Sequence, residues 1–116
     1  MRSIKGCIAA AKQNNDVIMT TNSHVYFDYY QSAPEEEPLA IGGHTTVENV
    51  YSFDPTSKEL SDKDARKIIG AQGNLWTEHI STPEHVEYMI LPRMSALAGV
   101  VWTPFEKKLE RFFKQT

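Results

Sequence analysis

The sequence predicts an α/β fold built from short parallel strands and helices. Two short runs with the character of buried strands, 16–21 and 70–78, are each bounded by polar or turn-forming residues. Apolar residues at helical spacing precede the first run and follow the second. The expected order is helix, strand, aromatic loop, short helices, strand, helix and helix. This order is that of a pair of βα units.

Length and composition indicate one soluble globular domain. The chain has 116 residues, of which 41% are hydrophobic and 23% are charged, and we expect residues 1–116 to belong to a single domain. The formal net charge is −3 and no basic stripe is present, so neither nucleic acid nor an anionic membrane is an expected partner. The single cysteine, Cys7, excludes an internal disulfide.

The N-terminal stretch 1–12 does not resemble a signal peptide, because basic residues interrupt it and no apolar region follows. No run approaches the roughly 18 apolar residues that a membrane-spanning helix needs. We therefore expect the chain as given to be soluble, and its location in the cell stays unassigned.

In the first half, residues 3–14 are expected to form an amphipathic helix, and residues 16–21 a strand buried on both faces. The aromatic stretch 23–31 follows. Residues 32–43 have the composition of a loop, and their three consecutive glutamates are expected to be solvated, because adjacent side chains diverge instead of converging on one ion.

In the second half, we expect a helical turn over 48–53 and a short helix over 61–69, capped by Ser61. After the strand at 70–78, Thr82 and Pro83 begin a further helix. Pro92 should interrupt it, and a final amphipathic helix should follow Thr103. The apolar face expected for the 85–102 region consists of Val86, Met89, Ile90, Met94, Leu97 and Val101.

Two parallel strands are not a stable sheet by themselves, because both edges and both faces need cover. The sequence therefore has the pattern of one part of a larger architecture. We expect a homo-oligomer, or association with a further portion of a barrel, to cover the open edges.

An aromatic residue and an acid, separated by one residue, follow each expected strand. Trp76 and Glu78 would lie on one side of an extended run, and Tyr26 and Asp28 repeat the pattern. Because function collects at the C-terminal ends of parallel strands, the two pairs could face one cleft. An aromatic plate beside a carboxylate suits a sugar. The alternatives are a core tryptophan with a solvated glutamate, and tyrosines that pack a loop against the core.

Most other site chemistries are excluded. The histidines His24, His44, His79 and His85 lack metal-ligand spacing, so neither a metal nor a cofactor is expected. Glycine-rich phosphate loops and a Gly-x-Ser-x-Gly elbow are absent, and Cys7 lies on an expected helix. Carbohydrate chemistry remains, and by the two-carboxylate rule Asp28 and Glu78 could be the acid and the second group of a glycosidase.

Five segments together resemble the C-terminal part of the catalytic barrel of the β-N-acetylhexosaminidases, glycoside hydrolase family twenty: Asp16–Thr20, Tyr26–Tyr30, Tyr51–Pro55, Gly70–Glu78 and His85–Met94. The match covers nearly the whole chain in the family's order. It implies an incomplete (β/α)8 TIM-barrel fragment, with about the last two βα units and C-terminal helices. Its two strands would be the seventh and eighth.

The resemblance also implies a function for each aromatic-acid pair. Tyr26 would hydrogen-bond the acetamido oxygen of an N-acetylhexosamine, and Asp28 would bind polar groups nearby. Trp76 would form the wall on which the sugar packs, and Glu78 would accept bonds from hydroxyls far from the acetamide. Family members remove terminal N-acetylhexosamine from glycans by substrate-assisted catalysis, and full-length members are often exported.

Two departures from the family limit what this chain would do alone. The adjacent Asp-Glu pair that supplies the orienting group and general acid in the family is absent, and Thr21-Asn22 stands where a proline-containing turn is expected. The chain would thus supply sugar-binding residues and be inactive alone. The alternative is a non-catalytic carbohydrate-binding or self-associating remnant.

Overall fold

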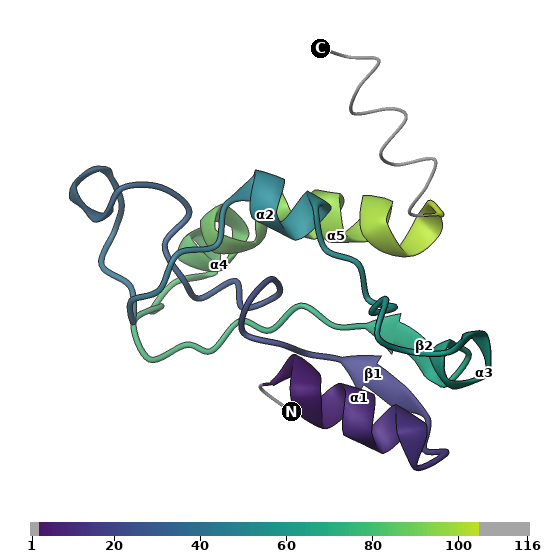
Figure 1. The fold of residues 1–116 in the computed structure, drawn as a ribbon. Helices are drawn as coiled ribbons and strands as arrows, with labels where there is room; N and C mark the ends of the chain where they lie inside the picture. Colours follow the sequence, from purple (N-terminus) through teal and green to yellow (C-terminus); the bar gives the residue numbers. More distant parts are fainter. Residues whose placement is uncertain (1–2, 105–116) are drawn as a thin grey trace.

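A parallel pair of short strands forms the centre of the fold. The computed structural model describes residues 3–104, in which β1 (Val17–Met19) pairs with β2 (Ile68–Ala71). Val17 lies opposite Ile68 and Met19 opposite Ala71, with an irregularity between Val17 and Ile18. Helix α1 (Ile4–Lys12) lies along β1, as Figure 1 shows.

The other helices connect and cover this pair. Helix α2 (Val47–Tyr51) packs against α5 (Arg93–Trp102), and α4 (Pro83–Ile90) contacts the start of α5 (Figure 1). Helix α3 (Asp62–Ala65) leads into β2, and a single 3-10 turn, η1, spans Pro34–Glu36. One hydrophobic core joins the strands to α1, α2 and α5, and its buried members are Cys7, Ala11, Val17, Met19, Val25, Phe27, Val50, Phe53, Ala96, Leu97 and Val100.

Hydroxyl side chains begin four of the helices. The hydroxyls predicted as caps, on Ser61 and Thr82, accept hydrogen bonds from the backbone N–H groups of Asp64 and His85. Ser3 caps α1 and Thr46 caps α2 in the same way. Because each cap satisfies a helix N–H that has no partner inside the helix, each contributes about 1 kcal/mol.

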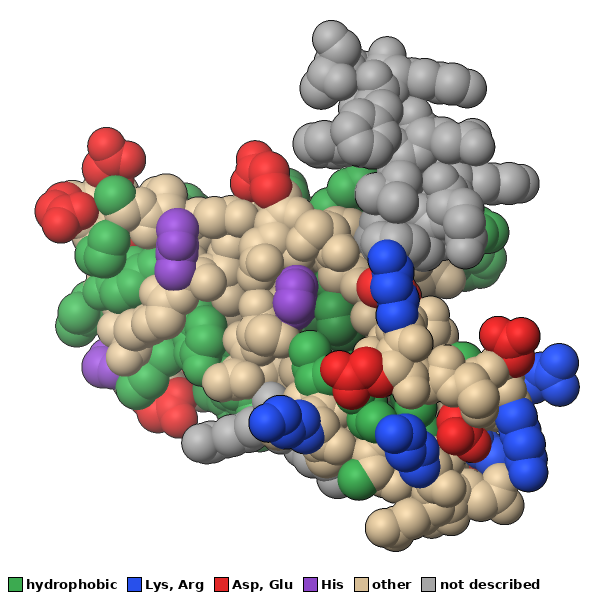
Figure 2. All heavy atoms as spheres, viewed as in Figure 1, with side chains coloured by type: hydrophobic (Ala, Val, Ile, Leu, Met, Phe, Trp, Pro, Cys, Tyr) green, Lys and Arg blue, Asp and Glu red, His purple; other side chains and the backbone are tan. Residues whose placement is uncertain are grey.

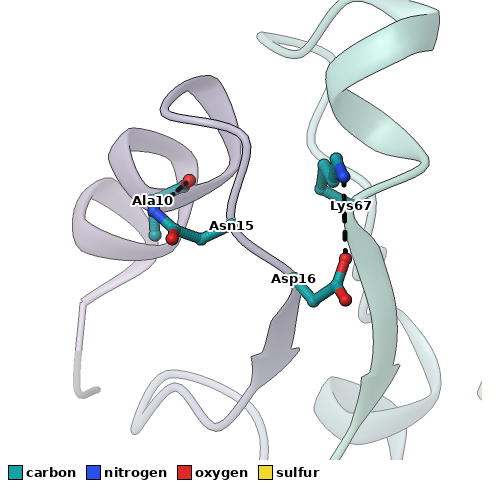
Figure 3. A network of polar contacts seen from close by, with 4 residues as sticks. All are labelled: Ala10, Asn15, Asp16 and Lys67. Carbon is teal, nitrogen blue, oxygen red and sulfur yellow. Dashed lines mark hydrogen bonds and ion pairs between the residues drawn. The ribbon is translucent and has the colours of Figure 1, made fainter.

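Polar contacts set where β1 begins (Figure 3). The Asn15 side-chain amide donates to the carbonyl oxygen of Ala10 at 3.2 Å, which folds the chain back beside α1. The half-buried Lys67 places its ammonium 3.9 Å from the exposed Asp16 carboxylate, and a single ion pair at the surface contributes little stability. The stronger constraint is the backbone bond from Val17 N to Lys67 O at 2.7 Å, which aligns the two strands.

The expectation that the first strand is buried on both faces was wrong. Val17 and Met19 are buried, but the intervening Ile18 is 49% exposed, and Ile69 in β2 is 62% exposed. Successive side chains of a strand point to opposite faces, and the described residues cover only the face that carries Val17 and Met19. Two exposed isoleucines therefore lie on an uncovered sheet surface.

The second strand lies earlier in the chain than the sequence predicted. Residues 68–69, expected at the end of a helix, belong to β2, and the helix ends at Ala65. β-Branched isoleucines favour the paired strand. The strand predicted over 70–78 ends at Ala71. Beyond that residue, Asn74 forms an isolated bridge with Tyr26. The sequence therefore predicted the segment correctly as β-rich but misplaced its bounds.

Pro92 interrupts the last helical region as predicted, and α4 and α5 lie on either side of it. The predicted apolar face is only partly correct. Met89 and Leu97 are buried, but Met94 and Val101 are 48% and 49% exposed, while Ala96 and Val100 face the core instead. The interruption resets the helical register, so a single face cannot run through both helices.

The final helix predicted after Thr103 falls largely on residues 105–116, outside the described residues. No helix within residues 3–104 combines the length and the apolar character that crossing a bilayer requires.

Gly73 lies where the chain after β2 crosses the ring of Phe27. A Cβ at this position would lie 2.6 Å from Phe27 Cε2, whereas a Cβ at Gly70 would meet no atom within 4 Å. We expect Gly73→Ala to lower the free energy of unfolding by about 1–3 kcal/mol, because a buried ring must shift. Urea denaturation measures this. Gly70→Ala is the matched control and should change stability by less than about 1 kcal/mol. Equal losses in both variants would refute the close approach.

Candidate functional site

The segments that follow the two strands remain side by side. Gln72 N donates to Met19 O at 2.9 Å, Asn74 N donates to Val25 O at 2.8 Å, and Phe27 N donates to Asn74 O at 2.7 Å. Because the strands are parallel, both segments leave the sheet in the same direction. They carry the aromatic-acid pairs to one end of the molecule.

Tyr26 and Trp76, the two aromatic residues of these pairs, contact each other. Tyr26 forms an isolated parallel bridge with Asn74, and its ring centroid lies 6.4 Å from that of Trp76 in an edge-to-face arrangement. Tyr26 is 8% exposed, whereas Trp76 is 51% exposed. Trp76 is therefore not a core residue, and part of its indole surface is free to contact a ligand.

Trp76 and the two carboxylates Asp28 and Glu78 line one crevice, although Trp76 and Glu78 do not belong to a continuous strand. Tyr26 does not line this crevice, and it is connected to the crevice residues through its ring contact with Trp76. The crevice as it stands has no room for a water molecule. Its remaining lining residues come from the 32–43 loop, the segment after Glu78 and α4: Leu39, Ala40, Ile41, His79, Ile80 and Met89.

Asp28 is a buried carboxylate with an unused acceptor. It is 6% exposed, and its Oδ1 atom has no hydrogen-bond partner among the described residues. Burial raises the pKa of Asp28, and the negative charge of Glu78 adds to this rise, while the backbone amides of Asp28 and Trp76 and the charge of Arg93 oppose it. A buried acceptor without a donor is costly, and a ligand that brought a hydrogen-bond donor to Asp28 would remove this cost.

Glu78 is exposed. Its charge acts on Asp28, so the two carboxylates form an acceptor-rich end of the crevice. Groups that donate several hydrogen bonds, such as neighbouring sugar hydroxyls, match this chemistry.

Arg93 organises this region, and the sequence did not point to it. Its side chain is fully buried at the start of α5. The guanidinium donates to the carbonyl oxygens of Phe27, of Tyr29 at 2.9 Å and of Thr45 at 3.1 Å. It also donates to Met89 O, through Nε at 3.0 Å. Phe27 and Tyr29 flank Asp28 in the sequence, so Arg93 fixes the backbone on both sides of the buried carboxylate.

Among residues 3–104, no carboxylate forms a salt bridge with Arg93. Burial lowers the pKa of Arg93 to about 10, while attraction to Asp28 and Glu37 opposes the change, so the guanidinium stays protonated at neutral pH. It also lies 5.3 Å from the centroid of the Phe27 ring, a cation–π contact. Carbonyl dipoles and an aromatic face thus compensate for its burial.

Metal ligation does not account for these carboxylates. Within residues 3–104, no three His, Cys, Asp or Glu side chains gather in a way that could hold a metal ion.

Comparison with known proteins shows the family to which the chain belongs. Residues 2–105 match the glycosyl hydrolase family 20 catalytic domain. A match over most of the chain establishes that the protein belongs to this family of glycosidases. The predicted fold class is confirmed, since the chain corresponds to part of a family 20 TIM barrel.

Individual relatives agree with the family assignment. The chain is 47% identical over 108 residues to a β-hexosaminidase of Porphyromonas gingivalis, which covers 92% of this chain and 14% of the relative. A β-hexosaminidase of Vibrio furnissii is 35% identical over 99 residues, which cover 84% of this chain and 16% of the relative. The chain thus spans about a seventh of the length of these relatives.

Solved structures support the same fold. The family 20 exo-β-N-acetylglucosaminidase of Vibrio harveyi, in complex with N-acetylglucosamine, superposes with a TM-score of 0.75 at 28% identity, covering 95% of this chain and 18% of that one. The family 20 β-N-acetylhexosaminidase of Streptomyces coelicolor gives a TM-score of 0.75 at 27% identity, covering 92% and 22%.

Replacing Arg93 should unfold the loops that carry the site. We expect Arg93→Met to lower the free energy of unfolding by at least about 3 kcal/mol, because several buried carbonyls lose their donor together. Arg93→Lys should lose less, since it keeps the charge but not the planar fork. Thermal or urea denaturation measures both. Arg66→Met, at an exposed arginine, is the control. If Arg93→Met lowers the free energy of unfolding no more than Arg66→Met does, the proposal that Arg93 holds these loops in place is contradicted.

Asp28→Asn should stabilise the protein at neutral pH. Because the folded-state pKa of Asp28 lies above its usual 3.8, the folded state binds the proton more tightly than the unfolded state. Binding this proton stabilises the folded state fully below pH 3.8, and this stabilisation is lost as the pH rises through the folded-state pKa. We expect a gain of about 0.5–2 kcal/mol at pH 7 that shrinks towards pH 3.5, measured by denaturation across pH. Asp16→Asn, at an exposed carboxylate, should show no comparable gain. A destabilised Asp28→Asn protein at pH 7 would refute this account.

Proposed function

We propose that this chain supplies the sugar-holding wall of a β-N-acetylhexosaminidase that removes terminal N-acetylhexosamine from glycans. The main support is the crevice in which Asp28, Trp76 and Glu78 meet, with the Asp28 Oδ1 atom buried and without a donor. A sugar hydroxyl would supply that donor. The names of the β-hexosaminidase relatives, and the N-acetylglucosamine bound to the Vibrio harveyi enzyme, point to the same substrate class.

Each site residue has a distinct part in this proposal. The half-exposed indole of Trp76 packs against the apolar face of the pyranose ring. Asp28 binds polar groups of the substrate nearby, and Glu78 accepts hydrogen bonds from hydroxyls remote from the acetamide. Tyr26, held edge-to-face against Trp76, donates its phenolic hydrogen to the acetamido oxygen and so assists by holding the group that attacks the anomeric carbon.

Asp28 and Glu78 are thus binders in this proposal and not the acid and nucleophile of a two-carboxylate mechanism. Substrate-assisted hydrolysis needs a general acid and a group that orients the acetamide. No Asp-Glu pair occurs in residues 1–116, so in this proposal those groups come from outside this segment and the chain does not hydrolyse glycosides alone.

The open surfaces of the sheet support association with a further part of a barrel. Ile18 and Ile69 are exposed on the strands. A groove of about 300 Å³ runs between β2 and the end of α5, lined on its apolar side by Phe53, Ile68, Ile69, Val100 and Val101. Unpaired strand edges next to apolar surface attract another strand. We infer that the remaining barrel covers them, and the second candidate is self-association of this chain without catalysis.

A segment exchange tests the proposed function. The exchange protein is the Porphyromonas gingivalis β-hexosaminidase with its matching segment replaced by this chain, and the assay is hydrolysis of 4-nitrophenyl N-acetyl-β-glucosaminide. We expect turnover by the exchange protein and none by the 116-residue chain. Glu78→Gln should lower kcat/KM about 10- to 100-fold, because one charge-assisted hydrogen bond to substrate is weakened.

Glu59→Gln is the matched control, because Glu59 is exposed and belongs to the 52–60 segment that precedes α3 and does not line the crevice. It should leave kcat/KM unchanged. A folded exchange protein in which Glu78→Gln behaves like Glu59→Gln would overturn the assignment of Glu78 to the substrate. Turnover by the 116-residue chain alone would overturn the proposal that the general acid and the orienting group come from outside this segment.

A further inference from the structure

The 32–43 loop is tied to α4 by a carboxylate that the sequence assigned to a solvated run. Glu35 and Glu36 are exposed as expected. Glu37, in contrast, accepts hydrogen bonds from the Ser32 hydroxyl at 2.5 Å and from the Tyr88 hydroxyl at 2.5 Å, one on each carboxylate oxygen. We call Ser32, Glu37 and Tyr88 the latch.

Further contacts hold the same loop. The Gln31 side-chain amide donates to the carbonyl oxygen of Tyr88 at 2.7 Å, and Ala40 N donates to the Tyr30 hydroxyl at 3.2 Å. At the far end, Gly43 has φ +67 and lies so close to Tyr29 that a Cβ would be 2.5 Å from the ring. The loop is therefore fixed at both ends and in the middle, despite having only one 3-10 turn.

The charge state of the latch suits neutral pH. Hydrogen bonds from Ser32, and then from Tyr88, lower the pKa of Glu37. The bond to Glu37 in turn raises the pKa of Tyr88. The carboxylate is therefore ionised and the phenol protonated throughout the neutral range, so the acceptor and the donor are both available.

The latch places apolar residues against the acceptor-rich end of the crevice. Leu39 and Ile41 are 69% and 51% exposed, and Ala40 between them is 8% exposed. All three line the crevice with Asp28 and Glu78. Figure 2 shows hydrophobic side chains gathered at the loop end of the molecule, while Lys and Arg side chains lie towards the α1 and α3 end. We call Leu39–Ile41 the apolar wall.

We propose that the apolar wall, held in place by the latch, determines which hydroxyl configuration the Asp28–Glu78 end of the pocket accepts. This inference rests on the proposed function. It concerns N-acetylhexosamines that differ at a hydroxyl remote from the acetamide, such as N-acetylglucosamine and its 4-epimer N-acetylgalactosamine.

The physical basis is the lack of a hydrogen-bond partner on the wall side chains. A hydroxyl directed at Asp28 or Glu78 gains an acceptor, whereas a hydroxyl directed at Leu39 or Ile41 loses its water and gains none. An unpaired buried hydroxyl costs about 1–3 kcal/mol, which corresponds to roughly 5- to 150-fold in kcat/KM.

The test compares the 4-nitrophenyl β-glycosides of N-acetylglucosamine and N-acetylgalactosamine with the exchange protein. We expect the ratio of the two kcat/KM values to move at least 5-fold towards unity in Leu39→Ala, which removes the wall. Tyr88→Phe and Glu37→Gln, which weaken the latch, should move it in the same direction. Glu36→Gln is the matched control at the neighbouring exposed glutamate and should leave the ratio unchanged.

The outcomes separate this inference from the proposed function. An active exchange protein whose activity depends on Glu78, but whose substrate ratio stays within 2-fold in all three variants, would overturn the role of the wall alone. A folded exchange protein without turnover would overturn the proposed function and this inference together. A general loss of activity with an unchanged ratio counts as a structural effect of the loop and also contradicts the proposal.

A second measurement does not depend on the exchange protein being active. In the isotope-labelled chain, millimolar N-acetylglucosamine should shift the indole N–H resonance of Trp76 and the amide resonances of Ala40 and Ile41 along the same titration curve. Glu36→Gln should preserve these shifts, and Leu39→Ala should reduce those of Ala40 and Ile41. Shifts at Trp76 without any at Ala40 and Ile41 would place the sugar away from the wall.

Discussion

The buried guanidinium of Arg93 is the interaction on which the loop half of the structure depends. Its donors bind carbonyl oxygens from the segment after β1, the segment before α2 and the end of α4. The other Lys and Arg side chains among residues 3–104 belong to α1 or to the region around α3. A single cation therefore neutralises carbonyl dipoles where irregular segments converge, and its charge opposes the rise that burial causes in the pKa of Asp28.

The site follows from that constraint. Parallel strands carry Tyr26 and Trp76 to one end of the sheet, and Arg93 fixes the backbone on either side of Asp28. The result is the exposed indole of Trp76 beside the buried carboxylate of Asp28 and the exposed carboxylate of Glu78. The molecule keeps an unpartnered carboxylate oxygen in a crevice at a cost in stability, which is common where proteins bind ligands. The chain belongs to glycosyl hydrolase family 20, and under the proposed function this cost is offset when a sugar hydroxyl donates to Asp28.

Local features could be predicted from the sequence, and contacts between distant segments could not. The caps at Ser61 and Thr82 and the interruption at Pro92 depend on neighbours within four residues. Arg93, in contrast, binds carbonyls 48 to 66 residues away, and Glu37 binds a hydroxyl 51 residues away. Every residue has a carbonyl oxygen, so no sequence pattern indicates which of them will accept a hydrogen bond from Arg93. The family resemblance supplied the site residues, which spacing alone left as one interpretation among several.

The most direct test of the account is a crystal structure of the exchange protein with N-acetylglucosamine bound. We expect the pyranose ring to pack on Trp76, one sugar hydroxyl to lie within hydrogen-bond distance of Asp28 Oδ1, and a second to lie within reach of Glu78. The carbonyl oxygens of Phe27 and Tyr29 should still accept hydrogen bonds from Arg93. A sugar bound in the pocket without contact to Trp76, or with Asp28 Oδ1 still without a donor, would contradict this account.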